Sequence, residues 1–378
     1  MTSEIDGCHS PKASRFRTRR GPPVCKLPGP PLRSSAALLG AVVLTLGSVF
    51  CSAQPLPHDP QVHFPPNLAE RFLPPTGIQW GYFRNADGAR IRYSHVGVGT
   101  GKQKVTVVLA HGNSEFGEKY FELMRDLSAR GCEIWQMDWR GYGGSDRYLT
   151  EREKAHSLGV GHDTRDLERF VRTIVKSSPD VPLVLIAHSM GAHIGARYLH
   201  DYPGRFTAAV LSSPFFSLAP EASQGVPAWM MRALIWGVNG IGLGESWAKG
   251  NGPWLDKPVE RLSHDPVRND VQRRWYRSNR ALRVGGVTNG WVREYFRSFD
   301  VMDKPGYYSA IQIPVLMGSA SDDALTRPDV QARACSAMPN CRLMRFEKAW
   351  HELFMESESI RSRWLDATTA FLDGRASR

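Results

Sequence analysis

The sequence predicts an α/β protein with a mostly parallel sheet, helices on both faces and a mainly helical insertion. The first observation is that short strand-like runs alternate with helical stretches between residues 105 and 212, which is the pattern of βαβ units. The second is that the alternation stops between residues 214 and 305, a segment rich in Trp, Arg and Gly, and resumes at residue 314. We therefore expect this segment to form a cap inserted into the core.

The individual elements follow from local patterns. Extended segments at 79–84 and 90–95 flank a turn at 85–88 and predict a hairpin. Further strands are predicted at 105–110, 133–137, 183–187, 208–212, 314–317 and 342–346. Amphipathic stretches predict helices at 120–130, 164–175, 192–202 and 357–372.

These elements divide the chain into four parts. We expect a basic leader over 1–53, a Pro-rich linker over 54–75, a core over 76–213 and 306–378, and the cap over 214–305. With 378 residues, 42% of them hydrophobic, the chain is long enough for the core to bury a large apolar interior.

The leader carries a targeting pattern. Residues 1–33 hold seven Lys or Arg and two acids, and the uncharged apolar run 36–53 follows and ends on the small residue Ala53. This arrangement is typical of an export signal. The run also reaches the lower limit for a transmembrane helix, roughly 17 to 18 residues, so a single anchor is an alternative. We therefore expect an exported or membrane-associated protein.

Composition excludes several classes of site. The charge outside the leader is mildly basic, and no basic tract interleaved with aromatic residues indicates nucleic-acid binding. The six cysteines include no C-x-x-C spacing, so we predict neither a metal site nor a cofactor that depends on one. If the chain is exported, we predict a disulfide between Cys335 and Cys341, because they flank a short helix-to-strand turn at 336–340, whereas Cys132 is expected to stay a buried thiol.

The segment 183–192, LVLIAHSMGA, carries the strongest chemical signal. An apolar strand runs into a small-x-Ser-x-Gly turn and then a helix, the context that exposes a nucleophilic serine, here Ser189. The N–H of Met190 would donate to the oxyanion of the substrate. The alternative is that Ser189 is an ordinary helix N-cap.

A serine nucleophile requires a base and an acid further along the chain. His351 follows the last predicted strand and is the expected base, while His200 and His264 are expected to be structural. After the preceding strand, Asp322 and Asp323 are both candidates for the acid that orients the base. Another expected oxyanion donor is the N–H of Asn113, in the loop after the first parallel strand.

Four motifs together resemble the monoacylglycerol lipase and lysophospholipase group of α/β-hydrolases, closest to the bacterial lysophospholipase L2 type. They are His111-Gly112, Asp138-x-Arg140-Gly141-x-Gly143-x-Ser145, Ala187-His188-Ser189-Met190-Gly191 and Ala349-Trp350-His351-Glu352. The resemblance extends into the cap at residues 283–292. It implies the α/β-hydrolase fold, and it places the acid on Asp323 with Asp322 still open.

The resemblance also implies hydrolysis of a single-chain lipid ester without a cofactor. A lysophospholipid is the favoured substrate, and a monoacylglycerol or a general carboxylic ester is the alternative. A hydrolase-like domain that binds at a membrane without catalysis is a separate hypothesis. Apolar cap residues expected to line an acyl channel are Phe215, Phe216, Leu218, Trp229, Met230, Met231, Leu234, Ile235 and Trp236.

Charge in the cap bears on the head group. Residues 261–300 hold nine arginines and four acids. Guanidinium groups match phosphate geometry, so we expect this segment, and Arg277 and Arg280 in particular, to favour a lysophospholipid head group or peripheral contact with an anionic bilayer.

Overall fold

The computed structural model describes residues 63–99, 101–219 and 226–376. These residues form an eight-stranded sheet in the order β1-β2-β4-β3-β5-β6-β7-β8. Antiparallel pairing is confined to β1 with β2 and β2 with β4, and the remaining neighbours are parallel. The strands are β1 (Gln79–Arg84), β2 (Arg90–Val96), β3 (Val105–Ala110), β4 (Cys132–Met137), β5 (Leu183–His188), β6 (Ala208–Ser212), β7 (Val315–Ala320) and β8 (Cys341–Phe346).

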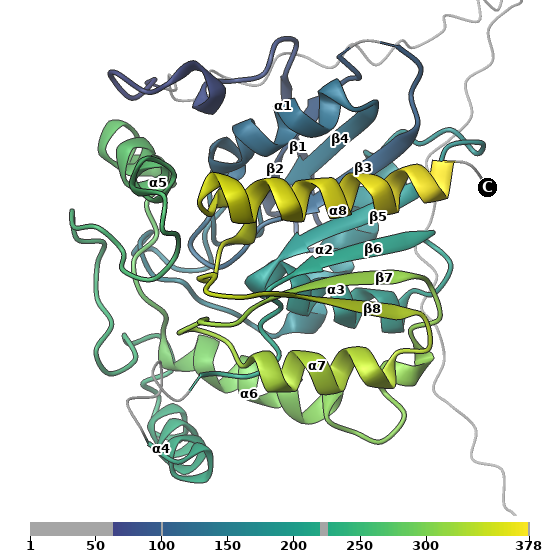
Figure 1. The fold of residues 1–378 in the computed structure, drawn as a ribbon. Helices are drawn as coiled ribbons and strands as arrows, with labels where there is room; N and C mark the ends of the chain where they lie inside the picture. The colour runs from purple at the N-terminus through teal and green to yellow at the C-terminus, as the bar shows by residue number, and fades with distance from the viewer. Residues whose placement is uncertain (1–62, 100, 220–225, 377–378) are drawn as a thin grey trace, which may run out of the picture. The chain divides into compact units, whose positions relative to one another are not determined.

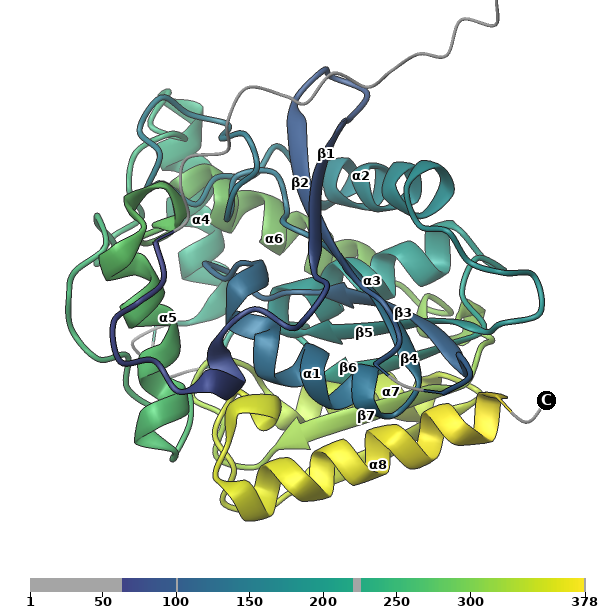
Figure 2. The same ribbon diagram turned by 90° about the horizontal axis from the view of Figure 1, so that it is seen from above.

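Helices cover both faces of this sheet (Figures 1 and 2). Apolar residues of α1 and α8 pack in the core on one face, and those of α2, α3 and α7 pack on the other. The core helices are α1 (Phe121–Ala129), α2 (Val160–Thr173), α3 (Ser189–Asp201), α7 (Pro328–Ala337) and α8 (Glu358–Ala376). The predicted α/β architecture is confirmed, and α2 and α3 each begin three or four residues earlier than expected.

The central strands show why the sheet is buried on both faces. Every residue of β3, β5, β6 and β7 is buried. In these strands the run of Val, Leu, Ile and Ala lacks polar alternation, as expected where helices cover both sides of a parallel sheet. The loops that follow these strands at their carboxyl ends are therefore held by a rigid frame.

Between β6 and β7 the chain leaves the sheet and forms helices. They are α4 (Ala228–Gly240), α5 (Pro266–Ser278) and α6 (Asn289–Met302). Figure 1 shows α4 and α5 at one side of the sheet, with α6 beneath it. In the part of this segment that the structure describes, β-structure is limited to isolated bridges such as Trp247 with Thr288.

The described part of the predicted linker belongs to the folded body. Phe72 is buried, and the Arg125 side chain donates to the carbonyl oxygens of Leu73 and Pro74. Phe64 meets the ring of Trp275 edge to face, with centroids 6.2 Å apart. The Pro-rich composition predicted a linker over 54–75, and the contacts that anchor its described part come from distant segments that leave no local pattern. The leader lies outside the described residues, and no described helix is long and apolar enough to span a bilayer.

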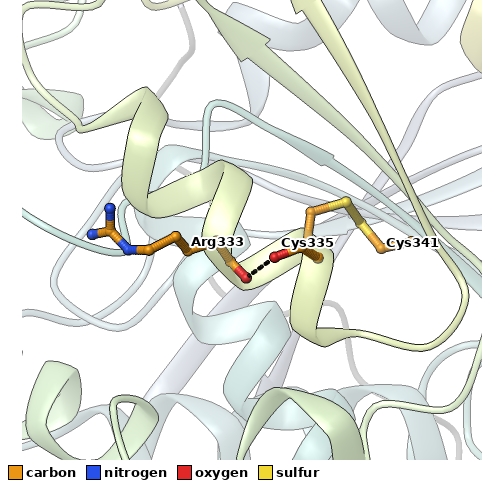
Figure 3. Close-up of a disulfide and its surroundings, with 4 residues drawn as sticks. Arg333, Cys335 and Cys341 are labelled. Atoms are coloured by element: carbon orange, nitrogen blue, oxygen red, sulfur yellow. Dashed lines mark hydrogen bonds between the residues drawn. A yellow bond between two sulfur atoms is a disulfide. The ribbon is translucent and has the colours of Figure 1, made fainter.

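A disulfide joins the end of α7 to the start of β8 (Figure 3). The Cα atoms of Cys335 and Cys341 lie 5.3 Å apart, within the range that a disulfide requires. The predicted bridge is confirmed. Cys132 is a buried free thiol, as expected, and burial raises its pKa to about 12.

Candidate active site

Ser189 lies at the turn between β5 and α3 in a strained backbone conformation. Its φ is +50°, a left-handed value that non-glycine residues rarely adopt. A Cβ on Gly191 would approach the carbonyl oxygens of Ala110 and His111 to 2.3 and 2.5 Å, so only glycine fits there. The turn is therefore pressed against the end of β3. This is the strand-turn-helix geometry of a nucleophile elbow, not that of an ordinary N-cap, which has extended backbone angles.

His351 and Asp323 meet beside the elbow. Nδ1 of His351 lies 2.7 Å from Oδ2 of Asp323. The same carboxylate accepts from the hydroxyl of Thr326 at 2.6 Å and from the backbone N–H groups of Leu325 and Thr326. The ring of His351 lies 4.7 Å, centroid to centroid, from that of His188, which directly precedes Ser189. A fixed carboxylate on Nδ1 leaves Nε2 of His351 as the basic nitrogen.

The electrostatics favour an ionised acid beside a basic imidazole. Burial opposes charge on both groups, but their attraction prevails, so the pKa of His351 is raised and the pKa of Asp323 is lowered. Hydrogen bonds from Thr326 and Leu325 lower the pKa of Asp323 further. Asp322 is exposed and accepts from its neighbour Ser321, so it does not share this environment.

The loop after β3 brings Asn113 to the same cavity as Ser189 and Met190. The side chain of Asn113 is held by the hydroxyl of Tyr142, which donates to Oδ1 at 2.9 Å. Next in the chain, Ser114 has a φ of +57°, and its carbonyl accepts from Tyr276 of the cap at 2.5 Å. The loop is therefore fixed from both core and cap.

The cavity over Ser189 has a volume of about 570 Å³ and a mainly apolar wall. Of the cap residues expected to line an acyl channel, the structure places Phe215, Leu218, Met231, Leu234 and Ile235 on this wall. Phe216 lines an adjoining cavity instead. The expectation is wrong for Trp229, Met230 and Trp236, which lie exposed on α4. The sequence of α4, AWMMRALIWGVNG, is apolar on nearly every side, so its pattern does not distinguish the face on the cavity from the exposed one.

None of the nine arginines in 261–300 lines the cavity. Arg277 is exposed and pairs with Asp256 at 2.7 Å, and Arg280 is also exposed. Arg268 is buried in a cluster with Glu122, Asp265 and Glu358. Arg277 and Arg280 therefore do not line the cavity over Ser189, contrary to the expectation that they face a head group bound there. Acids one to four residues away pair with other arginines of this segment, as Asp270 does with Arg274.

A buried group of potential metal ligands lies beneath the site. Ligand atoms of Glu115, His188 and Glu352 lie within 4.8 Å of one another. The ammonium of Lys119, however, lies 2.8 Å from Glu115 and 2.5 Å from Glu352. This ammonium supplies the positive charge that the carboxylates need, so the set fits an internal cation rather than a metal ion.

Comparisons with known proteins agree with this geometry. A family model described as "Serine aminopeptidase, S33" matches residues 101–358. The chain belongs to this hydrolase family. A shared fold does not by itself define the substrate class.

Several relatives similar in sequence are named as enzymes that act on lipid esters. The chain is 27% identical to lysophospholipase L2 of Escherichia coli K12 over 277 residues, covering 71% of this chain and 80% of the relative. It is also 27% identical to the monoacylglycerol lipase of Mycolicibacterium smegmatis over 281 residues, covering 73% and 91%. The fold matches a soluble variant of the Saccharomyces cerevisiae monoglyceride lipase with a TM-score of 0.64 and 20% identity, covering 85% of this chain and 98% of that one.

Two features of the site were missed from the sequence. Lys249 lines the cavity from the loop after α4, and Lys119 joins two active-site loops from below. Only the pair of Glu115 with Lys119, four residues apart in the sequence, could have been noticed there, because the contact of Lys119 with Glu352 joins residues 233 positions apart. No local pattern distinguishes Lys249 from other cap cations.

Proposed function

We propose that this protein hydrolyses the carboxylic ester of a single-chain lipid, with a lysophospholipid as the preferred substrate. The observation that supports this most strongly is the elbow itself, since Ser189 opens into a cavity whose wall is mainly apolar. Such a cavity buries one acyl chain, and each buried methylene contributes about 0.8 kcal/mol to binding.

Each residue has a defined part in the proposed reaction. His351 removes the proton of Ser189 as its Oγ attacks the acyl carbonyl, and Asp323 stabilises the imidazolium that forms. The N–H groups of Asn113 and Met190 donate to the oxyanion. His351 then protonates the departing glycerol oxygen, which leaves an acyl-enzyme. A water molecule, deprotonated by His351, releases the fatty acid and restores Ser189.

Lys249 supports the choice of a phosphate-bearing substrate. Among the residues that the structure describes, it is the only charged one on the cavity wall, and none of them forms an ion pair with its ammonium. The N–H of Ala248 donates to the carbonyl of Val287 at 3.0 Å, which holds this loop beside α6. An unpaired cation at the rim of an apolar cavity suits an acyl chain that ends in an anionic head group.

Replacing Lys249 by Met is expected to reduce kcat/KM for a lysophospholipid about 5- to 20-fold and to leave a monoacylglycerol of equal chain length within about twofold. The difference should shrink as salt is added, because the ammonium is exposed and screened. Initial rates on both substrates below their critical micelle concentrations measure this.

The matched control is Arg277→Gln, which removes an exposed cap cation that does not line the cavity. It should leave both rates unchanged. If the wild type hydrolyses the monoacylglycerol faster, and Lys249→Met affects both substrates alike, then phosphate recognition is wrong and a monoacylglycerol lipase or general carboxylesterase takes its place.

We also propose export of the folded body. Two features support it: the basic leader followed by an apolar run, and the disulfide between Cys335 and Cys341. Disulfides persist in oxidising compartments and are rare where thiols are kept reduced.

Peripheral contact with a bilayer completes this proposal. Its support is a set of large apolar side chains exposed on α4 and the loop after it: Trp229, Leu234, Trp236, Ile241 and Leu243. Trp229 is 72% exposed and Ile241 74%. Exposed apolar residues grouped on one element are typical of a surface that enters a lipid interface, where Trp is favoured.

Cell fractionation and thiol alkylation test export, and vesicle binding tests the contact of α4 with a bilayer. The full chain should be recovered with the cell envelope, and Cys335 and Cys341 should resist alkylation until a reductant is added. The double variant Trp229→Ser, Ile241→Ser should bind anionic vesicles at least about fivefold more weakly, because it loses apolar area that enters the interface. Alkylation of both cysteines without reductant would refute export, and unchanged vesicle binding would refute the role of α4.

A further inference from the structure

Lys119 is a buried lysine whose ammonium contacts three separate segments. It lies at the end of a short 3-10 helix, Gly117–Tyr120, and its side chain is 2% exposed. Nζ donates to Oε1 of Glu115 at 2.8 Å, to Oε1 of Glu352 at 2.5 Å and to Oε1 of Gln272 at 2.9 Å. An ammonium has three N–H donors, so each donor is used on a different segment.

The contact of Lys119 with Glu115 fixes the loop that carries Asn113. Oε2 of Glu115 accepts from the backbone N–H of Gly112 at 2.5 Å and from the hydroxyl of Tyr120 at 2.6 Å. A Cβ at Gly112 would come within 2.9 Å of this carboxylate. Glu115 therefore fixes the peptide immediately before the proposed oxyanion donor.

The contact of Lys119 with Glu352 fixes the loop that carries His351. Glu352 is the next residue, its side chain is 4% exposed, and its backbone N–H donates to Leu262 O at 2.9 Å. The third contact reaches the cap, where Gln272 also donates to the carbonyl of Ser114 at 3.0 Å. One ammonium thus connects the oxyanion loop, the base loop and the cap.

The charges of this cluster reach the base as well. Burial opposes ionisation of Glu115 and Glu352, but Lys119 holds the pKa of Glu115 well below its usual value, whereas the pKa of Glu352 is raised. Burial lowers the pKa of His188 to about 3, so this ring stays neutral between the cluster and His351. Glu352 and Glu115 both favour the protonated form of His351.

We propose that Lys119, with Glu115 and Glu352, is a positioning device that sets the distance between the oxyanion donor at Asn113 and the base His351. None of the three touches the reacting atoms. Because oxyanion donors act only when they meet the developing charge at hydrogen-bond distance, a small shift between these two loops reduces the rate without weakening substrate binding.

The test uses the rate at which a fluorophosphonate labels Ser189, together with kcat and KM on a water-soluble p-nitrophenyl ester. Labelling needs both the oxyanion donors and the base but not the natural substrate, so it separates this proposal from the proposed lipid specificity. If the wild type labels at Ser189 but cleaves no lipid ester, only the proposed function fails.

Lys119→Met keeps the side-chain length and removes the bridge. We expect both the labelling rate and kcat to fall about 30- to 100-fold, with KM within about twofold. Near-UV circular dichroism measures the folded fraction, to which the rates are normalised. The control is Arg92→Met, which breaks another buried cluster, that of Arg92 with Glu118 and Asp138. It should lower Tm but leave the normalised rates within about threefold.

Glu352→Gln is the milder variant, and it tests the positioning role of the cluster if Lys119→Met does not fold. It keeps an oxygen that can accept from Lys119 but removes a negative charge near His351. We expect a smaller loss of kcat, about three- to tenfold, and an acid limb of kcat/KM that moves to lower pH. Normalised rates within twofold of wild type for the variants that fold, with an unmoved acid limb, would show that the cluster is only structural and overturn the proposal.

Discussion

Ser189→Ala is expected to reduce ester hydrolysis at least about a thousandfold while leaving the fold intact. The serine supplies the only atom proposed to bond covalently to the acyl group. Alanine removes this atom and adds no bulk at a crowded turn. Steady-state rates on a p-nitrophenyl ester, with near-UV circular dichroism and Tm as controls for folding, measure the effect.

The backbone at Ser189 makes a second readout informative. The φ of +50° costs free energy that any non-glycine residue must bear, so Ser189→Ala should have a Tm close to wild type, whereas Ser189→Gly should be inactive with a Tm that is equal or higher. Residual turnover above about one thousandth of wild type in the folded Ala variant would exclude Ser189 as the nucleophile.

Asp323→Asn is expected to lower kcat about 10²- to 10⁴-fold, because the amide cannot stabilise the imidazolium and favours the wrong tautomer of His351. Asp322→Asn is the matched control one residue away. Its side chain is exposed and bonded to Ser321, so kcat should stay within about twofold of wild type. If the two variants lost kcat equally, or if Asp322→Asn lost more, Asp323 would not be the acid that orients His351.

The pH dependence of kcat/KM should also differ between the two variants, in a direction that the electrostatics of the site predict. His351 must be neutral to accept the proton of Ser189, and Asp323 raises its pKa, so wild-type kcat/KM should fall with acid through a pKa above the ordinary histidine value. Removal of the Asp323 charge lowers that pKa, and the acid limb of the residual activity should move to lower pH. Asp322→Asn should leave it in place.

The sheet was predictable because its pattern is local. β5 and the turn after it could be assigned from 183–192 alone, because an apolar strand that runs into a serine between small residues is typical of this turn, and at Gly191 the structure leaves no room for a Cβ. The order of acid and base along the chain then placed the other two residues within short loops. Of the adjacent acids, only Asp323 has Thr326 and Leu325 as hydrogen-bond partners, and this distinction needs three dimensions.

The charges of the cap could not be predicted from composition for a related reason. Whether an arginine is available depends on the nearest acid in space, and Asp256 pairs with Arg277 from 21 residues away. Lys249 stands out only because the fold brings it to the cavity wall. The buried bridge at Lys119 joins residues separated by 233 positions, so no sequence window contains it.

The remaining alternative is a hydrolase-like domain that binds lipids without catalysis. Backbone strain at Ser189 and a buried carboxylate on His351 argue against it, since both cost stability and serve no purpose in a binding domain. Strain of this kind is typical of sites where geometry matters for a reaction.

Covalent labelling tests the central claim most directly. The full chain is treated with a fluorophosphonate, and the adduct is located by mass spectrometry while hydrolysis of a lysophospholipid is followed in the same samples. The account predicts one phosphonyl group per chain, on Ser189, with hydrolysis lost in proportion to labelling. An unlabelled Ser189 in folded protein, or full hydrolysis after complete labelling, would contradict it.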